Sequence, residues 1–213
     1  MSVDFQPSLL DAVPDGGGHV GVGPLAGRIQ RTELSRGAWV DTLPGWFEGA
    51  DEVFAELLEA VPWRAEQRPM YDNVVDVPRL LHHYGVGDEL PHPALTEARE
   101  ALDAHYRPEL GEPFVTAGCC YYRDGQDSVA WHGDNIGRGR MHDTMVAIVS
   151  FGSPRKLQLR PVGGHTEMTH ALGHGDLIVM GGSCQRTWEH AVPKTSRPVG
   201  PRISVQFRPR NVF

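Results

Sequence analysis

The sequence is short of long apolar runs, cysteines and lysines, and each shortage excludes a class of protein. No apolar run reaches the roughly 18 residues that a membrane-spanning helix needs. The N-terminal residues lack the basic start and continuous apolar middle of a secretory signal. The cysteines are the neighbours Cys119 and Cys120 and the isolated Cys184, and no CxxC occurs, so neither a disulfide framework nor a zinc ribbon is indicated. We therefore expect a cytoplasmic protein that makes no contact with membranes.

Lysine is so scarce that the basic residues are almost all arginine. Of 20 basic residues 18 are arginine, and with 27 acidic residues the net charge is -7. An acidic balance argues against nonspecific binding of nucleic acid, which usually needs a basic surface. Arginine nevertheless grips phosphate and carboxylate groups with a two-pronged geometry. Five arginines crowd one stretch, where they either bind phosphates or pair with surface acids: Arg123, Arg138, Arg140, Arg155 and Arg160.

Length and composition predict a single globular domain of 213 residues, which we expect to be a monomer. Residues 1–45 are rich in Gly and Pro and are expected to form a loop-rich extension. Residues 46–112 contain two amphipathic helical patterns, at 50–61 and 92–106. From 113 to 213 the helical patterns give way to β-rich segments, so this part is expected to form the core of the domain.

The β-rich part consists of short segments separated by Gly, Pro and charged turns. In order they are FVTAGCCYY, SVAWHGD, TMVAIVSF, KLQLRP, TEMTHAL, DLIVMGG, TWEHAV and RISVQFR. Their number and spacing favour a two-sheet jelly roll over alternating strand–helix units. We therefore predict an α+β fold, with a double-stranded β-helix (jelly-roll) core and N-terminal helices packed on one face.

Two HxD motifs occur, although a chain with 11 histidines should show about one by chance. Side chains alternate along a strand, so the His and Asp of such a motif share a face and can hold a divalent metal. His174-Gly-Asp176 precedes a continuous apolar strand, where Gly-Asp is typical of a turn. His132-Gly-Asp134 has a distant partner in His190, and two histidines with one carboxylate can occupy one face of a metal ion.

The last β-rich segment carries two arginines, Arg202 and Arg208. An even number of positions separates them, so they share one face of the strand. An arginine on a buried strand is costly unless it meets an anion. An acid with two carboxylates, bound beside the metal, would supply such an anion.

The combination of HxD, a distant His and R-x5-R resembles the AlkB-like family of iron(II)- and 2-oxoglutarate-dependent dioxygenases. YYRDGQDSVAWHGD, IVSFG, HGDLIVMGG and TWEHAVP are similar to that family's core, and the resemblance spans about residues 113–210. VPRLLHHYG at 77–85 resembles its substrate-lid segment, which makes 46–112 a helical support and lid region. The resemblance implies Fe(II) as cofactor, with 2-oxoglutarate and O2 as cosubstrates.

The resemblance also implies a role for each matching residue. His132, Asp134 and His190 would be the catalytic metal ligands. Arg202 would pair with the distal carboxylate of 2-oxoglutarate, and Arg208 would lie near the metal-proximal carboxylate and Asp134. Contacts to the cosubstrate are thus expected from Tyr122, Arg202, Ser204 and Arg208.

Three positions depart from the family's pattern. Cys120 and Ser204 stand where members often carry asparagine, so some hydrogen bonds to the cosubstrate are lost but the site is retained. Ile136 stands where several nucleobase-repairing relatives carry an acidic residue that meets the base edge. This last departure leaves the substrate open.

The resemblance favours oxidative removal of N-alkyl groups from nucleobases in DNA or RNA, as in repair of alkylation damage. The alkylated base would lie in a single strand or be flipped out of a duplex. Residues expected to contact it are Arg79, Tyr84, Trp131, Arg138 and Arg140.

Two other functions compete with nucleobase dealkylation. The acidic charge and Ile136 favour a related dioxygenase that hydroxylates or demethylates a small molecule or a protein side chain. A cupin-like metal-binding module without oxidation is the third hypothesis, and its ligands would be His165, Glu167, His170 and His174.

Overall fold

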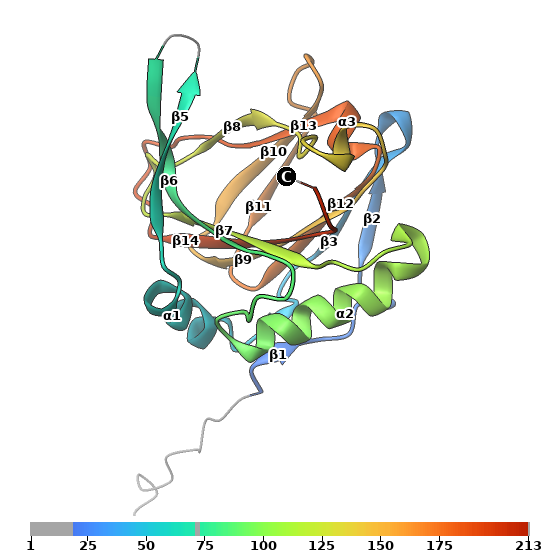
Figure 1. Ribbon diagram of the computed structural model, residues 1–213, viewed down its shortest axis with the longest axis horizontal. Coiled ribbons are helices and arrows are strands. Elements are labelled where there is room, and N and C mark those ends of the chain that lie inside the picture. Colours follow the sequence, from blue (N-terminus) through green and yellow to red (C-terminus); the bar gives the residue numbers. More distant parts are fainter. Residues whose placement is uncertain (1–18, 71–72, 213) are drawn as a thin grey trace, which may run out of the picture.

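The computed structural model describes residues 19–70 and 73–212, with the backbone alone at 68–70, 73–76 and 138. Two antiparallel sheets form its core (Figure 1). Across the larger sheet the strands are β2 (Gln30–Glu33), β3 (Ala38–Leu43), β12 (Asp176–Gly182), β9 (Val146–Gly152), β14 (Arg202–Arg208), β7 (Thr116–Tyr122), β6 (Asn73–Tyr84) and β5 (Arg64–Met70). Across the smaller sheet they are β11 (Met168–Leu172), β10 (Arg155–Pro161), β13 (Trp188–Val192) and β8 (Val129–His132).

The remaining elements are short, except for two helices. Strands β1 (Gly21–Val22) and β4 (Phe47–Glu48) pair with each other. The helices are α1 (Ala50–Ala60), α2 (Pro93–Leu110) and α3 (Cys184–Thr187), with 3-10 turns at Ser35–Gly37 and Arg138–Arg140. Within the described ranges, no helix is both long and apolar enough to cross a membrane.

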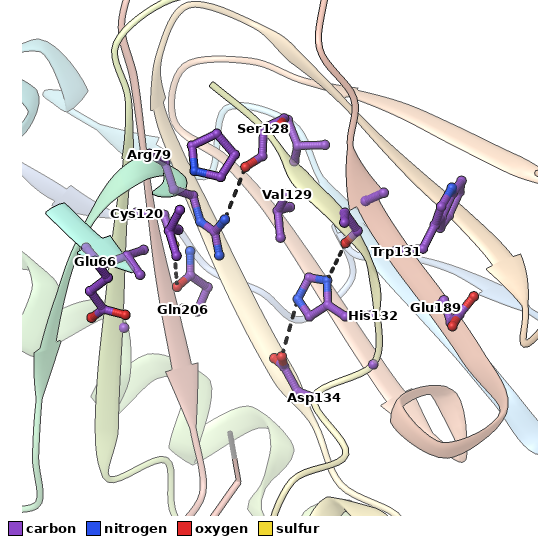
Figure 2. A pocket seen from close by; sticks show the side chains of 18 of the residues that line it. Glu66, Arg79, Cys120, Ser128, Val129, Trp131, His132, Asp134, Glu189 and Gln206 are labelled. Atoms are coloured by element: carbon purple, nitrogen blue, oxygen red, sulfur yellow. Dashed lines mark hydrogen bonds and ion pairs between the residues drawn. The ribbon is translucent and has the colours of Figure 1, made fainter. Parts of the chain in front are cut away.

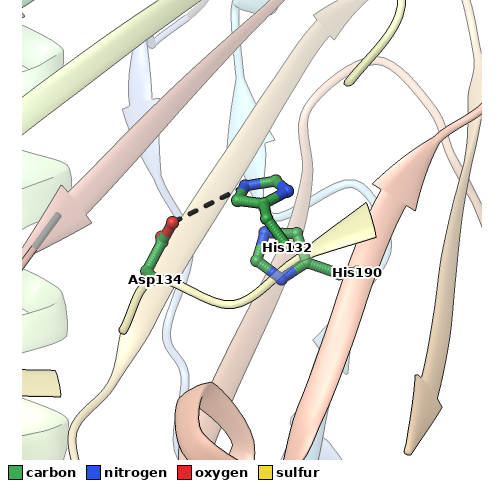
Figure 3. Close-up of side chains that lie close together, drawn as sticks. All are labelled: His132, Asp134 and His190. Carbon is green, nitrogen blue, oxygen red and sulfur yellow. Dashed lines mark ion pairs between the residues drawn. The ribbon is translucent and has the colours of Figure 1, made fainter. Parts of the chain in front are cut away.

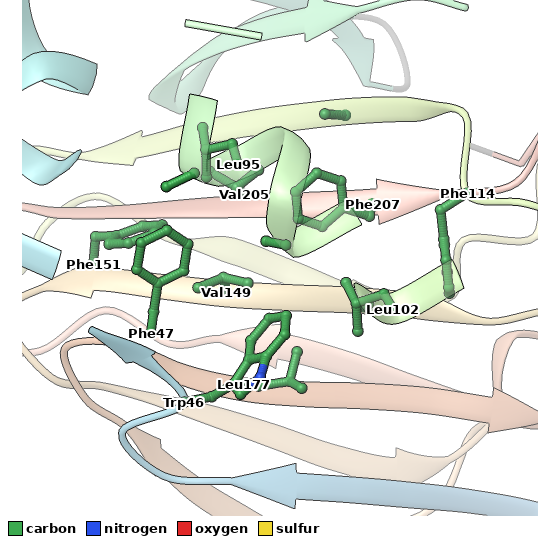
Figure 4. Close-up of a cluster of buried hydrophobic side chains, with 14 of the residues drawn as sticks. Trp46, Phe47, Leu95, Leu102, Phe114, Val149, Phe151, Leu177, Val205 and Phe207 are labelled. Carbon is green, nitrogen blue, oxygen red and sulfur yellow. The ribbon is translucent and has the colours of Figure 1, made fainter. Parts of the chain in front are cut away.

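Each face of the larger sheet contributes to a separate apolar core. On β9, Val149 and Phe151 face α1 and α2, whereas Val146 and Ile148 pack against the smaller sheet. Figure 4 shows Leu95 and Leu102 of α2 against the side chains of β9 and β14. The two N-terminal helices thus cover one face of a jelly roll, and all eight predicted β-rich segments contain a strand, which confirms the predicted fold.

The boundary predicted at residue 45 does not separate an extension from the core. Strand β3 pairs along its whole length with β12, with Leu43 opposite Leu177 and Ala38 opposite Gly182. The segment AWVDTL is mostly buried, so it is stable only as an interior strand. The lid segment at 77–85 likewise lies in β6, which pairs with β7 and extends the larger sheet.

A buried carboxylate, Asp41 on β3, ties the larger sheet to α2. Asp41 is 1% exposed and accepts hydrogen bonds from Arg31 Nε at 2.8 Å and from the Tyr106 hydroxyl at 2.9 Å. The Arg31 guanidinium also stacks 3.7 Å above the Trp39 ring. One side chain therefore joins β2, β3 and α2.

Replacing Asp41 with alanine is expected to lower the free energy of unfolding by about 3 kcal/mol, because it leaves the buried Tyr106 hydroxyl unpaired and Arg31 with only its exposed partner, Glu109. Urea denaturation measures this change. Glu109→Ala is the control, since it removes the exposed partner of Arg31 and should cost under about 1 kcal/mol. Equal losses in the two variants would contradict the argument.

Candidate active site

The HxD motif and the distant histidine meet at one end of the space between the sheets. His132 ends β8, Asp134 follows in the loop, and His190 lies on β13 directly opposite His132 in the antiparallel register. The ligand atoms of the three side chains all lie within 4.8 Å of one another (Figure 3). In the described part of the chain, no other group of His, Cys, Asp and Glu side chains gathers in this way. The structure therefore brings the predicted triad together.

Asp134 is held as a buried carboxylate by Arg208. Arg208 Nε and Nη2 donate to Asp134 Oδ2 at 3.0 and 2.9 Å. Burial raises the pKa of the Asp134 carboxyl, but the charges of Arg208, His190 and His132 outweigh burial and hold it well below its usual range. The other oxygen, Oδ1, lies 3.6 Å from His132 Nε2 and is left for a shared ion.

Both histidines present a form that can bind a metal. His132 Nδ1 donates to the Ala130 carbonyl oxygen at 2.8 Å, so Nε2 is the ring nitrogen left to face Asp134. Burial and the neighbouring His132 lower the pKa of His190 to about 3, and His190 is therefore neutral. Two imidazoles and one carboxylate form the donor set of a facial triad.

The residue between His132 and Asp134 is Gly133, and no side chain fits at this position. A Cβ on Gly133 would lie 2.4 Å from the carbonyl oxygen of Gln185 and 3.2 Å from that of Trp188. Both are backbone atoms, so they cannot turn aside as a side chain would. The chain at Gly133 thus packs directly on the segment that leads to His190.

Replacing Gly133 with alanine is expected to displace Asp134 and to weaken binding of a divalent metal by at least about tenfold. Titration of Mn(II) into the metal-free protein measures this. Gly85→Ala is the control, because a Cβ there meets only the Asp88 carboxylate at 3.4 Å, an ordinary contact. Wild-type metal affinity in Gly133→Ala would show that the close approach does not matter to the site.

A small cavity of about 70 Å³ adjoins the triad, between the inner face of β7 and β14 in the larger sheet and strands β8, β10 and β13 of the smaller sheet. Tyr122 lies opposite Arg202 in the strand register, and Arg202, Ser204 and Arg208 share the inner face of β14. Arg202 is 2% exposed, and its Nε donates to Ser150 Oγ at 2.9 Å. Its Nη1 is buried without a hydrogen-bond partner among the described residues. A buried guanidinium whose Nη1 lacks a partner fits a carboxylate ligand.

Gln206 also faces this cavity, although the sequence argument passed over it. Its Nε2 donates to the carbonyl oxygen and to the hydroxyl of Ser204 at 3.0 and 2.5 Å, and its Oε1 lies 3.7 Å from Cys120 Sγ. The signal was present, because residue 206 falls between Ser204 and Arg208 in the same two-residue period. Cys120 and Ser204, two of the three departures from the family's pattern, are thus linked through Gln206.

A second cavity, of about 970 Å³, opens in front of His132 and Asp134 and is bounded by β6, β7 and β8. Arg79 lines both cavities, and its Nη1 donates to the Ser128 carbonyl oxygen at 3.1 Å. Figure 2 shows Arg79, Cys120 and Gln206 on one side of His132, and Trp131 and Glu189 on the other. Its volume lies in the range of small-molecule sites, and His132 and Asp134 of the triad are part of its lining.

The predicted substrate contacts are only partly gathered at this cavity. Arg79 and Trp131 line it, whereas Tyr84 packs against the apolar core beneath the larger sheet. Tyr84 lies an odd number of residues from Arg79 and so points to the opposite face of β6. It is therefore not part of the site. Arg140 is exposed and does not line the cavity, and the Arg138 side chain lies outside the described residues. Ile136 lines the cavity and is 65% exposed.

Three of the five crowded arginines are already engaged within the protein. Arg123 pairs with Asp127 at 2.8 Å. Arg155 is buried and donates to backbone carbonyl oxygens, among them that of Pro193 at 2.9 Å. Arg160 pairs with Glu189 at 2.8 Å and stacks on Trp131 at 4.3 Å. They therefore stabilise loops and strands rather than forming a free basic rim.

The second HxD motif is a turn, as predicted. The Asp176 carboxylate accepts hydrogen bonds from the backbone N–H of Gly45 at 2.8 Å and of Gly173 at 2.7 Å. His174 Nδ1 accepts one from Gly152 at 2.7 Å. The hypothesis of a cupin-like module finds no support, because His165, Glu167, His170 and His174 form no such cluster in the part of the chain that is described.

Comparison with known proteins agrees with this geometry. Residues 41–208 match the model of the 2OG-Fe(II) oxygenase superfamily. The alpha-ketoglutarate-dependent dioxygenase alkB homolog 3 of Bos taurus is 33% identical over 184 residues, which cover 75% of this chain and 61% of that protein. DNA oxidative demethylase ALKBH2 of Arabidopsis thaliana is 30% identical over 135 residues, 52% of this chain and 42% of that protein. The chain thus spans about three fifths of the length of the alkB homolog 3 protein.

Solved structures share the fold at low sequence identity. The structure of OsALKBH1 superposes with a TM-score of 0.59 at 12% identity and covers 85% of this chain and all of that one. A prolyl hydroxylase from Trichoplax adhaerens, in complex with a peptide fragment, gives a TM-score of 0.56 at 12% identity over 80% of this chain and 83% of that one. The family match shows that the chain belongs to the 2OG-Fe(II) oxygenase superfamily, and the similarity to alkB homolog 3 agrees with the predicted resemblance to AlkB-like proteins.

Proposed function

We propose that this chain removes N-alkyl groups from nucleobases in DNA or RNA by oxidative dealkylation. The observation that carries the proposal is the cavity of about 970 Å³ in front of the triad, bordered by the lid strand β6. It has room for a flat base, and the small cavity beside it has room for part of a second ligand. The names of its relatives, a dioxygenase and a DNA oxidative demethylase, agree with this substrate class.

The residues of the site have separate tasks in this proposal. His132, Asp134 and His190 would hold Fe(II) on one face, which leaves the opposite face open. Arg202 would hold the distal carboxylate of 2-oxoglutarate, and Tyr122 would contact it. Ser204 and Arg208 would complete the cosubstrate contacts, and Arg208 also keeps Asp134 in place. Bound iron and 2-oxoglutarate supply the oxidising power that side chains lack.

The substrate base must leave any duplex to reach this site. The triad lies between the two sheets, where a stacked base pair cannot enter, so a single-stranded or flipped-out base is required. Arg79 and Trp131 line the path to the triad, and Ile136 borders it where an acidic residue would read an exocyclic amine. We therefore expect weak discrimination between methylated adenine and methylated cytosine.

The proposal is tested by mass spectrometry of single-stranded oligonucleotides that carry methylated adenine or cytosine. The protein is incubated with them in the presence of Fe(II), ascorbate, O2 and 2-oxoglutarate. We expect loss of the methyl group, with one succinate formed for each base repaired. The His190→Ala variant should leave the oligonucleotide methylated. Formation of succinate with no demethylated base on any strand would reject the nucleic-acid substrate.

One set of observations favours the alternative, a dioxygenase of a small molecule or a protein side chain. Arg123, Arg155 and Arg160 are engaged within the protein, and the net charge is -7. Neither feature suits a polyanionic substrate. In this alternative the same triad and the same cosubstrate contacts serve a different occupant of the large cavity.

Salt dependence separates the two substrates. If the substrate is a nucleic acid, affinity for a single strand falls with salt with a slope of roughly 0.7 for each phosphate contacted. Replacing Arg138 and Arg140 with alanine should lower this slope without changing affinity for metal or 2-oxoglutarate. Fluorescence anisotropy of a labelled strand measures it. Binding that does not respond to salt, or no binding, favours the alternative.

A further inference from the structure

The short helix α3 lies against the loop that carries Asp134, and Gln185 makes the contact. Gln185 is 1% exposed, and its Oε1 accepts a hydrogen bond from the backbone N–H of Asp134 at 2.9 Å. Its Nε2 is also buried and has no hydrogen-bond partner within the described residues. A backbone N–H can only donate, so the amide must turn its oxygen toward Asp134. The orientation of this side chain is thereby fixed.

A backbone contact holds the same two segments together. The main chain of Gly133 packs so closely on the carbonyl of Gln185 that a Cβ would lie 2.4 Å from its oxygen. Helix α3 leads directly into β13, which carries His190. The contact between Gln185 and residues 133 and 134 therefore sets the distance between the segment of Asp134 and the segment of His190.

We propose that Gln185 is a positioning residue, which fixes the backbone of Asp134 relative to His190 before a metal ion binds. The proposal rests on the proposed metal role of the triad. Without Gln185 Oε1 the N–H of Asp134 would be buried and unpaired, and the loop would shift to satisfy it. A metal ion would then have to reorder the loop as it binds, which weakens its affinity.

Mn(II) titration of the metal-free full chain, without 2-oxoglutarate, tests the proposal. Gln185→Leu removes the acceptor at similar size and is expected to raise the Kd for Mn(II) by about 10- to 100-fold. Gln185→Glu keeps an oxygen in place, so its Kd for Mn(II) should be equal to or lower than the wild-type Kd. Gln30→Leu, the same change on the edge strand β2, should leave the Kd unchanged.

Thermal unfolding of the same metal-free variants separates positioning from mere stability. A purely structural role predicts that Gln185→Leu lowers the Tm at an unchanged Kd for Mn(II), and this result would overturn the proposal. An equal loss of affinity in Gln185→Glu would also overturn it, because the hydrogen bond would then not be the cause. Gln185→Met provides the same comparison if the leucine variant does not fold.

Failure of the proposed metal site gives a different pattern. If the wild-type chain binds no Mn(II), or if His190→Ala binds it equally well, the triad is not the metal site and the role of Gln185 falls with it. If the triad is required but Gln185→Leu binds like the wild type, only the positioning role is rejected.

Discussion

Replacing Arg202 with alanine is expected to weaken 2-oxoglutarate binding by at least tenfold, at unchanged affinity for the divalent metal. Arg202 is 2% exposed, and its Nε donates a hydrogen bond to Ser150 Oγ at 2.9 Å. Its buried Nη1 has no partner in the described part of the chain, so a carboxylate supplies what the site lacks. A hydrogen bond to a charged group contributes roughly 1.5–3 kcal/mol, and about 1.4 kcal/mol is a factor of ten. Anaerobic titration of 2-oxoglutarate into the Mn(II)-loaded protein measures the effect.

Two other variants decide whether the geometry or only the charge of Arg202 matters. Arg202→Lys should restore affinity only in part, because an ammonium group cannot reproduce the two-pronged contact. Arg123→Ala removes an arginine that pairs with Asp127 and should leave 2-oxoglutarate binding unchanged. Wild-type affinity in Arg202→Ala would mean that Arg202 has been misassigned.

Replacing Asp134 with alanine should have a still larger effect: loss of detectable Mn(II) binding and of 2-oxoglutarate turnover. Asp134 is the one anionic ligand of the triad. Its removal also leaves Arg208, which donates to Asp134 Oδ2 at 3.0 Å, as an unpaired cation beside the site. That cation repels a divalent metal where the carboxylate attracted it. Metal titration and the measurement of succinate by mass spectrometry follow the two losses.

The control for Asp134 is a carboxylate with the same kind of partner. Asp127 is buried and pairs with Arg123 at 2.8 Å, but it does not belong to the triad. Asp127→Ala should lower stability and keep metal binding. Stoichiometric binding of Mn(II) by Asp134→Ala would remove Asp134 from the ligand set.

The jelly-roll core was predictable because its signals are local. Short apolar runs bounded by Gly and Pro leave few alternatives to a strand, and all eight predicted segments contain one. The two-residue period places His132 and Asp134 on one side of the chain, and it also joins Arg202 to Arg208. The same period would have excluded Tyr84 from the site and included Gln206, had it been applied to every residue of β6 and β14.

The rest of the site depends on contacts between distant segments. Nothing near Gln185 in the sequence shows that its amide meets Asp134, because that contact needs α3 to pack on the loop after β8. Arg155 has the composition of a phosphate-binding residue, yet it is buried against backbone carbonyls of two loops. The position of β3 within the larger sheet likewise follows from its pairing with β12. No local sequence pattern predicts that pairing.

The most direct test is to locate the positions at which a metal ion and 2-oxoglutarate bind. In an anaerobic crystal grown with Mn(II) and 2-oxoglutarate, anomalous scattering locates the manganese and the electron density locates 2-oxoglutarate. We predict one manganese peak about 2.0–2.2 Å from a nitrogen of His132, a nitrogen of His190 and an oxygen of Asp134. The far carboxylate of 2-oxoglutarate should lie against Arg202. A manganese peak at any other group of residues, or 2-oxoglutarate bound away from Arg202, would contradict the account.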